Sequence, residues 1–142
     1  MKGKILVTIQ FTCLALLAIF TNWLILKWWV FILLSVSAFL AFWAMAIMKY
    51  GNFNIVPNPV EDGTMVSSGP YKLIRHPMYA SIFIFAAALL AGQFDYVKLA
   101  ISLALLACLV VKMSFEEDLL CKHYPGYKAY MGNTKRVIPF VW

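Results

Sequence analysis

The chain has little of the chemistry that metal proteins and disulfide-stapled proteins depend on. It holds only two histidines, six acidic residues and three cysteines among its 142 residues. Cys13, Cys108 and Cys121 lie far apart, with no Cys-x-x-Cys or Cys/His spacing. This pattern predicts neither a disulfide framework nor a zinc site, and we expect no bound metal.

Charge of either sign is also scarce. Charged residues make up 13% of the chain and hydrophobic residues 63%, whereas a soluble domain is only about half apolar. The mean hydropathy of +0.82 therefore predicts an integral membrane protein with the lipid bilayer as its main partner. The net charge of +6 indicates cationic loops facing the cytoplasm, so no nucleic-acid partner is expected.

Four apolar runs predict four transmembrane helices, at about residues 5–26, 30–48, 78–91 and 96–113. At about 1.5 Å per residue, the first run covers roughly the 30 Å of a bilayer's hydrocarbon core. Its basic start resembles a signal peptide, but the run is too long and lacks a clean cleavage site, so we expect it to be retained. We expect an all-α integral membrane protein in which residues 1–142 form one domain.

Two polar segments accompany these runs. Residues 49–77 are rich in turn-forming residues and predict a long loop, which is typical of a lid or binding loop. Residues 114–142 form a tail in which Pro125-Gly126 should break a helix that restarts at 127–131. Of the basic residues, only Lys27 and Lys98 fall on the side opposite to this loop. The positive-inside rule thus predicts a multi-pass inner-membrane protein with loop, tail and both termini in the cytoplasm.

The residues with reactive or ligand-binding side chains collect on that cytoplasmic side. Arg75-His76-Pro77 precedes the third run, Glu116-Glu117 follows the fourth, and several tyrosines lie in the tail. A mixed-charge, aromatic-walled cavity suits a zwitterionic or cationic ligand with an aromatic part. Adjacent helical residues point about 100° apart, so we expect one glutamate to face the ligand and the other to face solvent. The alternative for His76 is a structural cap of the helix that Pro77 begins.

Two blocks of sequence resemble the isoprenylcysteine carboxyl methyltransferase family and its phospholipid methyltransferase relatives. The first runs from Gly51-Asn52-Phe53-Asn54 through residues 62–71 to Ile74-Arg75-His76-Pro77-Met78-Tyr79. The second comprises Glu116-Glu117, Tyr124, Tyr127, Tyr130 and residues 135–140. They flank a helical hairpin, as in that family, and with it cover roughly the C-terminal two thirds of the chain.

The resemblance implies an S-adenosylmethionine-dependent methyltransferase of the membrane, with the cofactor held under the C-terminal segment 114–142. The cofactor contacts that it implies are Val66, Gly69, Tyr71, His76, Pro77, Tyr79, Glu116, Tyr124, Tyr127 and Arg136. Arg75, with Glu116 or Glu117, is expected to orient the acceptor. Which glutamate is the family acid stays open.

The acceptor also stays open. A lipophilic or small carboxylate, thiol or amine would be compatible with the resemblance. An amine acceptor would require a general base, for which His76 or a glutamate is the candidate. Neither the site of acceptor access nor the oligomeric state follows from the sequence.

Three other functions are compatible with the composition. Sterol reductases resemble this family in their C-terminal membrane fold, so a membrane-embedded NADPH-dependent reductase is one, although no surplus basic cluster is present for a 2′-phosphate. A four-span transporter is another, but it needs an intramembrane ionisable group and the first three runs have none. The third is a purely structural protein, which cofactor binding would exclude.

Overall fold

The computed structural model of the chain describes residues 2–52 and 65–141, and its architecture is all-helical. The helices are α1 (Lys2–Ile19), α2 (Trp28–Asn52), α3 (Pro77–Gly92), α4 (Tyr96–His123) and α5 (Tyr127–Asn133). Two 3₁₀ turns, η1 (Trp23–Ile25) and η2 (Gly69–Lys72), lie between them. The predicted all-α class is confirmed.

Two of these helices are long and apolar enough to cross a membrane. They are α2, over Trp28–Met48, and α4, over Tyr96–His123. Helices α1 and α3 are also apolar but shorter, with 18 and 16 residues. Each of the four predicted runs therefore contains one helix, although two of the helices are short for a bilayer.

The first predicted span was placed too far along the chain, because α1 ends at Ile19 rather than near residue 26. The Thr21 hydroxyl donates to the Leu17 carbonyl at 2.7 Å. The Asn22 side chain then accepts from the Leu24 amide and starts η1. Polar side chains can form hydrogen bonds with nearby backbone groups that compete with the hydrogen bonds of a helix. Here such bonds form at Thr21 and Asn22, and the helix does not continue through them.

The polar segments depart from the predicted boundaries as well. Residues 49–52 continue α2 rather than beginning the loop predicted at 49–77. Helix α4 runs past the end of the predicted fourth span to His123, so both glutamates lie on it, as expected. Pro125-Gly126 breaks the chain as predicted, and α5 follows. Residues 53–64, including Phe53 and Asn54 of the first sequence block, lie outside the described residues.

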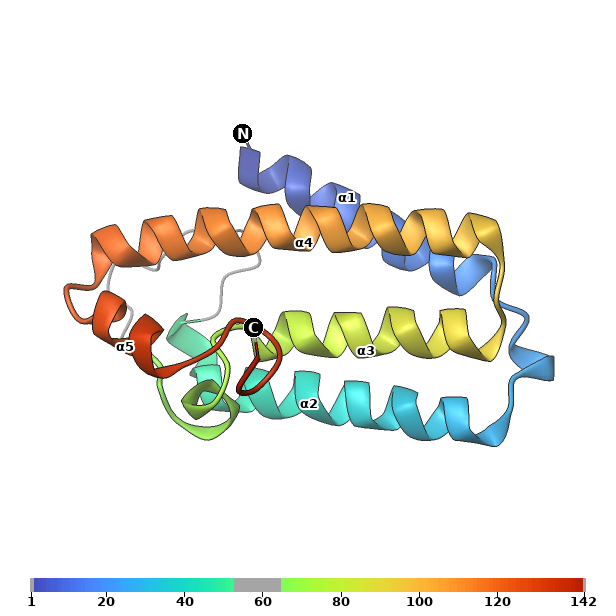
Figure 1. The fold of residues 1–142 in the computed structure, drawn as a ribbon, viewed down its shortest axis with the longest axis horizontal. Helices are drawn as coiled ribbons and strands as arrows, with labels where there is room; N and C mark the ends of the chain where they lie inside the picture. The colour runs from blue at the N-terminus through green and yellow to red at the C-terminus, as the bar shows by residue number, and fades with distance from the viewer. Residues whose placement is uncertain (1, 53–64, 142) are drawn as a thin grey trace.

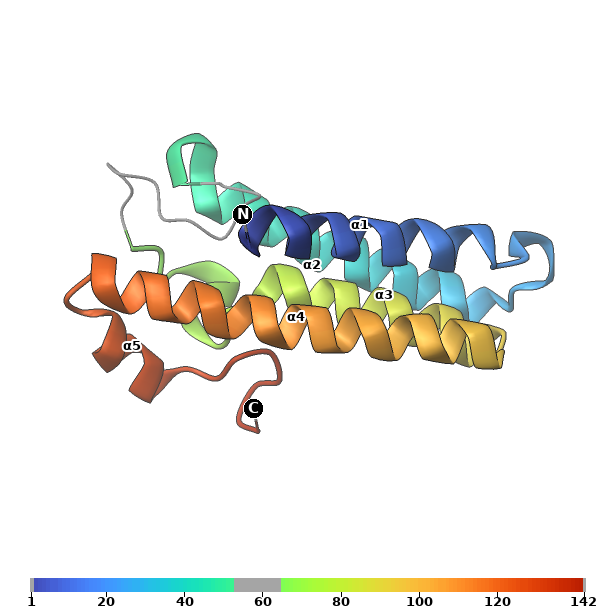
Figure 2. The same ribbon diagram turned by 90° about the horizontal axis from the view of Figure 1, so that it is seen from above.

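The four long helices run roughly along one axis and pack as two pairs (Figures 1 and 2). Helix α1 packs mainly on α4, and α2 packs mainly on α3, while α3 and α4 join the pairs. The shared core contains Leu17 of α1, Leu89 of α3, and Leu105 and Leu109 of α4, all fully buried. A smaller cluster around Met113 includes Val137, and it anchors the C-terminal segment to the bundle.

A polar contact network closes the end of the bundle where α1 leads into α2 and α3 into α4. Gln93 Oε1 accepts from the Asn22 amide at 3.1 Å and from Lys98 Nζ at 2.6 Å. Asp95 caps α4 by accepting from the backbone amides of Val97 and Lys98. The short turn predicted between the third and fourth runs is thereby fixed to the turn between α1 and α2.

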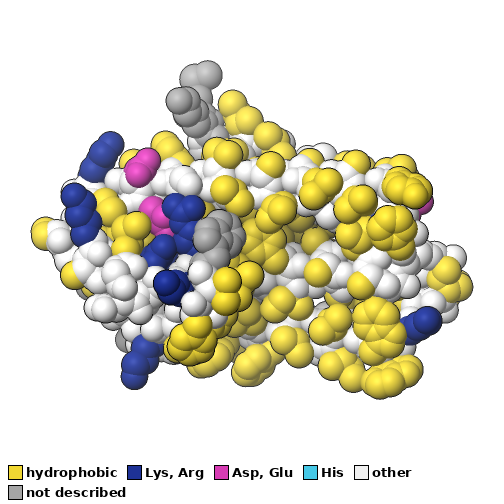
Figure 3. All heavy atoms as spheres, viewed as in Figure 1, with side chains coloured by type: hydrophobic (Ala, Val, Ile, Leu, Met, Phe, Trp, Pro, Cys, Tyr) yellow, Lys and Arg dark blue, Asp and Glu magenta, His cyan; other side chains and the backbone are white. Residues whose placement is uncertain are grey.

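The opposite end of the bundle is the cationic end. In Figure 3 hydrophobic side chains cover much of the helical surface, whereas Lys and Arg side chains gather over α5 and the C-terminal part of α4. Exposed apolar residues along α2 include Trp28, Phe39 and Phe42. This distribution is the one that a bilayer around the helices would require.

Candidate functional site

The C-terminal segment returns to the start of α3 and pairs with it there (Figure 1). The Arg75 amide donates to the Lys135 carbonyl at 2.7 Å, and the His76 amide donates to the Arg136 carbonyl at 2.9 Å. Ile74 and Lys135 form a parallel bridge. These backbone contacts bring the two separated sequence blocks together at the cationic end.

Glu117 lies at the centre of this junction. Its Oε1 is 2.8 Å from Arg75 Nε and 3.2 Å from His76 Nε2, and its Oε2 is 2.7 Å from Arg136 Nη2 and 3.0 Å from Arg136 Nε. The Glu117 side chain is only 4% exposed. Two guanidinium groups thus compensate one buried carboxylate, and Nε and Nη2 of Arg136 both donate to the same oxygen, Oε2.

Arg75 also ties the segment after α5 to this carboxylate. Its Nη1 donates to the Met131 carbonyl at 3.0 Å and to the Thr134 carbonyl. Arg75 therefore joins the residues just before α3 to α4, to α5 and to Thr134 after it. Both its Nε and its Nη1 donate to acceptors within the protein.

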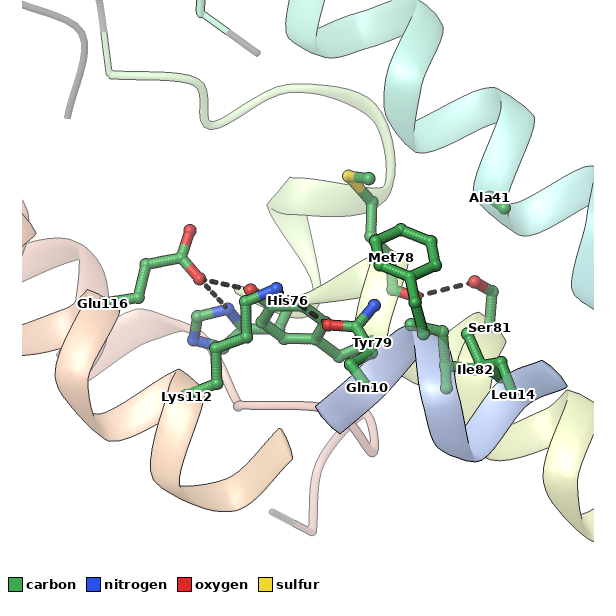
Figure 4. A pocket seen from close by; sticks show the side chains of 11 residues that line it. Gln10, Leu14, Ala41, His76, Met78, Tyr79, Ser81, Ile82, Lys112 and Glu116 are labelled. Atoms are coloured by element: carbon green, nitrogen blue, oxygen red, sulfur yellow. Dashed lines mark hydrogen bonds and ion pairs between the residues drawn. The ribbon is translucent and has the colours of Figure 1, made fainter. Parts of the chain in front are cut away.

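Glu116 faces a different environment from Glu117. It accepts a hydrogen bond from the Tyr79 hydroxyl at 2.8 Å, and its Oε2 is 3.8 Å from His76 Nδ1 (Figure 4). Its side chain is 26% exposed. The expectation that one glutamate would simply face solvent is wrong, because Glu117 is buried in ion pairs and Glu116 lines a cavity.

His76 lies between the two carboxylates. Its ring stacks on Tyr79 with centroids 5.3 Å apart and planes 21° apart. His76 is also the N-cap residue of α3, as the structural-cap alternative holds: its carbonyl accepts from the Tyr79 and Ala80 amides at 3.1 and 3.0 Å, although its side chain makes no capping hydrogen bond. The shorter of its two carboxylate contacts is the 3.2 Å contact from Nε2 to Glu117.

Tyr71 carries a buried hydroxyl with no hydrogen-bond partner among the described residues. Its carbonyl accepts from the Tyr130 hydroxyl. Burial and the nearby charge of Glu116 raise the pKa of Tyr71, so the phenol remains a neutral donor. Buried polar groups almost always find a partner, so this hydroxyl is an exception among the described residues, and Tyr71 does not line the cavity beside Glu116.

Two further tyrosines of the second block lie close to the same carboxylates. Burial and the charges of Glu117 and Glu116 raise the pKa of Tyr127. Burial raises the pKa of Tyr130 to about 12. The rings of Tyr127 and Tyr130 are 5.6 Å apart, so neutral aromatic side chains flank the acids on the α5 side.

A cavity of about 280 Å³ opens beside Glu116 (Figure 4). Its polar end is formed by His76, Tyr79, Glu116, Lys112 and Gln10. The remaining wall is mostly apolar and comes from α1, α2 and α3: Phe11, Leu14, Ala41, Met78, Ser81 and Ile82. Among the described residues, no group of three or more His, Cys, Asp or Glu side chains could hold a metal ion.

Several residues predicted to contact a cofactor lie away from this cavity wall. Gly69 has a φ of +58°, and a Cβ there would lie 2.8 Å from Ile47 Cγ1, so it allows η2 to pack on α2. Val66 is half-buried before η2. Tyr124 ends α4 and packs edge-to-face against His123 at 4.6 Å. His76, Tyr79 and Glu116 do line the cavity, whereas Arg136 acts on Glu117.

Sequence reasoning did not single out two polar residues of the cavity, Lys112 and Gln10. Lys112 is one of the basic residues that the positive-inside rule assigns to the cytoplasmic side. The signal available was its spacing, because residues four apart share a helix face and Lys112 precedes Glu116 by four. Nothing in the sequence alone places Gln10 of α1 beside it.

Comparison with known families places these residues in context. The model of the isoprenylcysteine carboxyl methyltransferase (ICMT) family matches residues 16–122. The matched range contains the first sequence block and both glutamates, and it ends before α5 and Arg136. A search of curated proteins found no match to the chain.

Proposed function

The chain belongs to the isoprenylcysteine carboxyl methyltransferase family, and from that premise we propose that it binds S-adenosylmethionine beside Glu116 and methylates an acceptor lying in the adjoining cavity. Membership makes the protein a methyltransferase of this family, whose enzymes are membrane proteins that use S-adenosylmethionine. The observation that carries the location is the convergence of the two sequence blocks at one cavity, where His76, Tyr79 and Glu116 meet.

The residues at this end fit such a cofactor. S-adenosylmethionine carries a sulfonium, an amino-acid zwitterion and an adenine ring, and when bound it supplies an electrophilic methyl carbon. The partly exposed Glu116 carboxylate suits a cationic group, and the rings of Tyr71, Tyr79 and Tyr127 suit cations and stacked bases. The orphan hydroxyl of Tyr71 provides a buried donor for a polar atom of the ligand.

The roles of the surrounding residues follow from their contacts. The Tyr79 hydroxyl holds the Glu116 carboxylate in place, and the His76 ring stacked on Tyr79 fills the space behind it. Glu117 keeps the C-terminal segment closed over this end through Arg75 and Arg136. Alignment and exclusion of water are the main demands of methyl transfer, and these contacts serve both. We therefore assign Arg75 to positioning rather than to acceptor contact.

The proposed arrangement in the membrane has four spans with this site on the cytoplasmic side. Helices α1 and α3 would be about 27 Å and 24 Å long at 1.5 Å per residue, a little short of the roughly 30 Å core. Local thinning of the bilayer accommodates such a mismatch at modest cost. The gathering of Lys and Arg at the α5 end supports the orientation (Figure 3).

Calorimetric titration of the detergent-purified protein with S-adenosylmethionine and S-adenosylhomocysteine tests the proposal. We expect saturable binding that Glu116→Gln weakens about tenfold or more, because a charge-assisted contact contributes about 1.5–3 kcal/mol. The matched control is Asp118→Asn, which removes an exposed acid from the same helix. Failure of the folded protein to bind either nucleoside, with saturable binding of NADPH instead, would favour the reductase.

A further inference from the structure

Lys112 and Glu116 carry opposite charges one turn apart on α4, yet the structure joins each of them to another partner. The two groups interact electrostatically, and residues four apart on a helix lie close enough to form an ion pair. Instead, Lys112 Nζ donates to Gln10 Oε1 at 2.8 Å. Glu116 accepts from the Tyr79 hydroxyl at 2.8 Å. Figure 4 shows both hydrogen bonds at the polar end of the cavity.

Tyr79 contacts both charged groups. Its hydroxyl donates to the Glu116 carboxylate. The centroid of its ring lies 5.2 Å from Lys112 Nζ, and the face of an aromatic ring attracts a cation. The hydrogen bond to Gln10 is therefore the directional contact of the ammonium, and it determines where the ammonium points.

Burial makes the choice of partner important for the lysine. Lys112 is 3% exposed and Gln10 is 6% exposed, whereas the Glu116 side chain is 26% exposed. A buried ammonium is costly to leave without a hydrogen-bond partner. If the Gln10 acceptor were removed, the flexible lysine side chain could reach the Glu116 carboxylate one turn away.

A second lysine of α4 is arranged in the same way. Lys98 is 2% exposed, and its Nζ donates to Gln93 Oε1 at 2.6 Å. Lys98 also interacts electrostatically with Asp95. The Asp95 carboxylate caps α4 instead, by accepting from the backbone amides of Val97 and Lys98. In both pairs a glutamine binds the lysine, while the nearby acid serves another group.

Gln10 comes from a part of the chain that family membership does not describe. It lies on α1, before the residues 16–122 that match the family model, whereas Lys112 and Glu116 lie within that range. Helix α1 packs mainly on α4, and this packing brings Gln10 to Lys112. The contact is thus a feature of this chain's own first helix.

We propose that Gln10 is a positioning residue that holds the Lys112 ammonium away from Glu116, so that the carboxylate stays available to the cationic methyl donor. This inference rests on the proposed function for the identity of the donor. Two cations compete for one carboxylate, and the lysine has the advantage of being in the same molecule. By accepting from the lysine, Gln10 removes the intramolecular competitor.

Calorimetric titration of four proteins with S-adenosylmethionine tests this role. They are the wild type, Gln10→Met, Lys112→Met and the variant with both substitutions. The thioether of methionine is only a weak acceptor and carries no charge. We expect Gln10→Met to weaken binding about tenfold, as for the loss of one charge-assisted contact. Lys112→Met alone should bind at least as tightly as the wild type, and the double variant should recover wild-type affinity.

Recovery in the double variant separates positioning from packing. If Gln10 served only the packing of α1 on α4, a second substitution at Lys112 would not restore binding. Gln93→Met is the matched control, because it makes the same exchange beside Lys98, and it should leave the affinity unchanged. Gln10→Ala serves as the second variant if Gln10→Met does not fold.

Thermal unfolding without ligand separates this inference from the proposed function. Glu116→Gln should change the unfolding temperature little in the wild type. In Gln10→Met it should lower that temperature by roughly 3 °C or more, because there it breaks a new ion pair with Lys112. If the wild type binds no S-adenosylmethionine but this difference appears, the positioning of Lys112 stands and the cofactor assignment fails.

Three results overturn the inference. The first is an unchanged affinity of Gln10→Met for S-adenosylmethionine. The second is a loss of affinity that Lys112→Met does not restore. The third is an equal effect of Glu116→Gln on the unfolding temperature in the wild type and in Gln10→Met.

Discussion

Glu116 and Glu117 follow one another in the chain, yet their carboxylates lie in two separate environments at the end of α4. Glu117 is enclosed by Arg75, His76 and Arg136, whereas Glu116 accepts from Tyr79 and lines the cavity. The His76 ring stands between them, with one nitrogen toward each. One turn of helix thus provides both an ion cluster that fixes the fold and an acid that can meet a ligand.

The first prediction concerns the ion cluster. Glu117→Gln leaves Arg75 and Arg136 without the carboxylate that compensates them, and removing one partner from a buried ion pair costs about 3–5 kcal/mol. We expect a large fall in the thermal unfolding temperature in detergent. Glu116→Gln should change stability by no more than about 1 kcal/mol while it weakens cofactor binding. Equal stability of the two variants would contradict the division of roles.

The second prediction uses the orphan hydroxyl. Tyr71→Phe removes a buried oxygen that has no partner among the described residues, so stability should stay the same or rise. If the cofactor uses that hydroxyl, its affinity should fall about tenfold, as expected for the loss of one hydrogen bond of about 1.4 kcal/mol. Thermal melts and calorimetry on one preparation measure both. A less stable variant with unchanged affinity would show that the hydroxyl serves the fold instead.

The third prediction concerns the close approach of η2 to α2. Gly69→Ala places a Cβ 2.8 Å from Ile47 Cγ1 at a φ of +58°, so we expect a loss of about 1–2 kcal/mol or more. Gly132→Ala is the control, because a Cβ there meets no atom within 4 Å. Adding Ile47→Ala should recover only part of the loss, since the backbone strain remains. Full stability of Gly69→Ala would exclude this packing.

The fourth prediction is a pH dependence. Burial raises the pKa of Tyr130 to about 12, above the usual value of 10. A raised folded-state pKa gives stability that is present below pH 10 and is lost as the pH rises through about 12. The stability difference between wild type and Tyr130→Phe should therefore be constant from pH 7 to 9 and shrink above 10. Chemical unfolding at each pH measures it, and a difference that grows with pH would contradict it.

Much of the helical framework could be predicted because apolar runs and breakers mark it directly. Pro125-Gly126 ends α4 and lets α5 begin, as expected. The residues at which the helices end were harder to predict than the helices themselves. An apolar run shows where lipid-facing residues stop, whereas backbone hydrogen bonding decides where a helix stops. Thus α1 ends early at Ile19, and α2 continues past Met48 to Asn52.

Part of the site could be predicted in the same way: the residues that line it, but not all of their contacts. Resemblance to the family indicated that His76, Tyr79 and Glu116 belong together, and they line one cavity. The resemblance could not show that Arg75 donates to Glu117 and to the carbonyls of Met131 and Thr134. Those contacts depend on how the C-terminal segment packs against the start of α3. The pairing of Lys112 with Gln10 joins residues from the first and fourth apolar runs, and only packing reveals it.

The central claim is that the cofactor lies between the two sequence blocks at the end of α4. Ultraviolet crosslinking of tritiated S-adenosylmethionine to the purified protein, followed by peptide mapping, tests it most directly. We expect label on peptides that contain Tyr71, Tyr79 or Tyr127, and we expect it to be reduced in Glu116→Gln and suppressed by S-adenosylhomocysteine. Label confined to the far end of the bundle, around Asn22 and Gln93, or label that S-adenosylhomocysteine does not suppress, would contradict it.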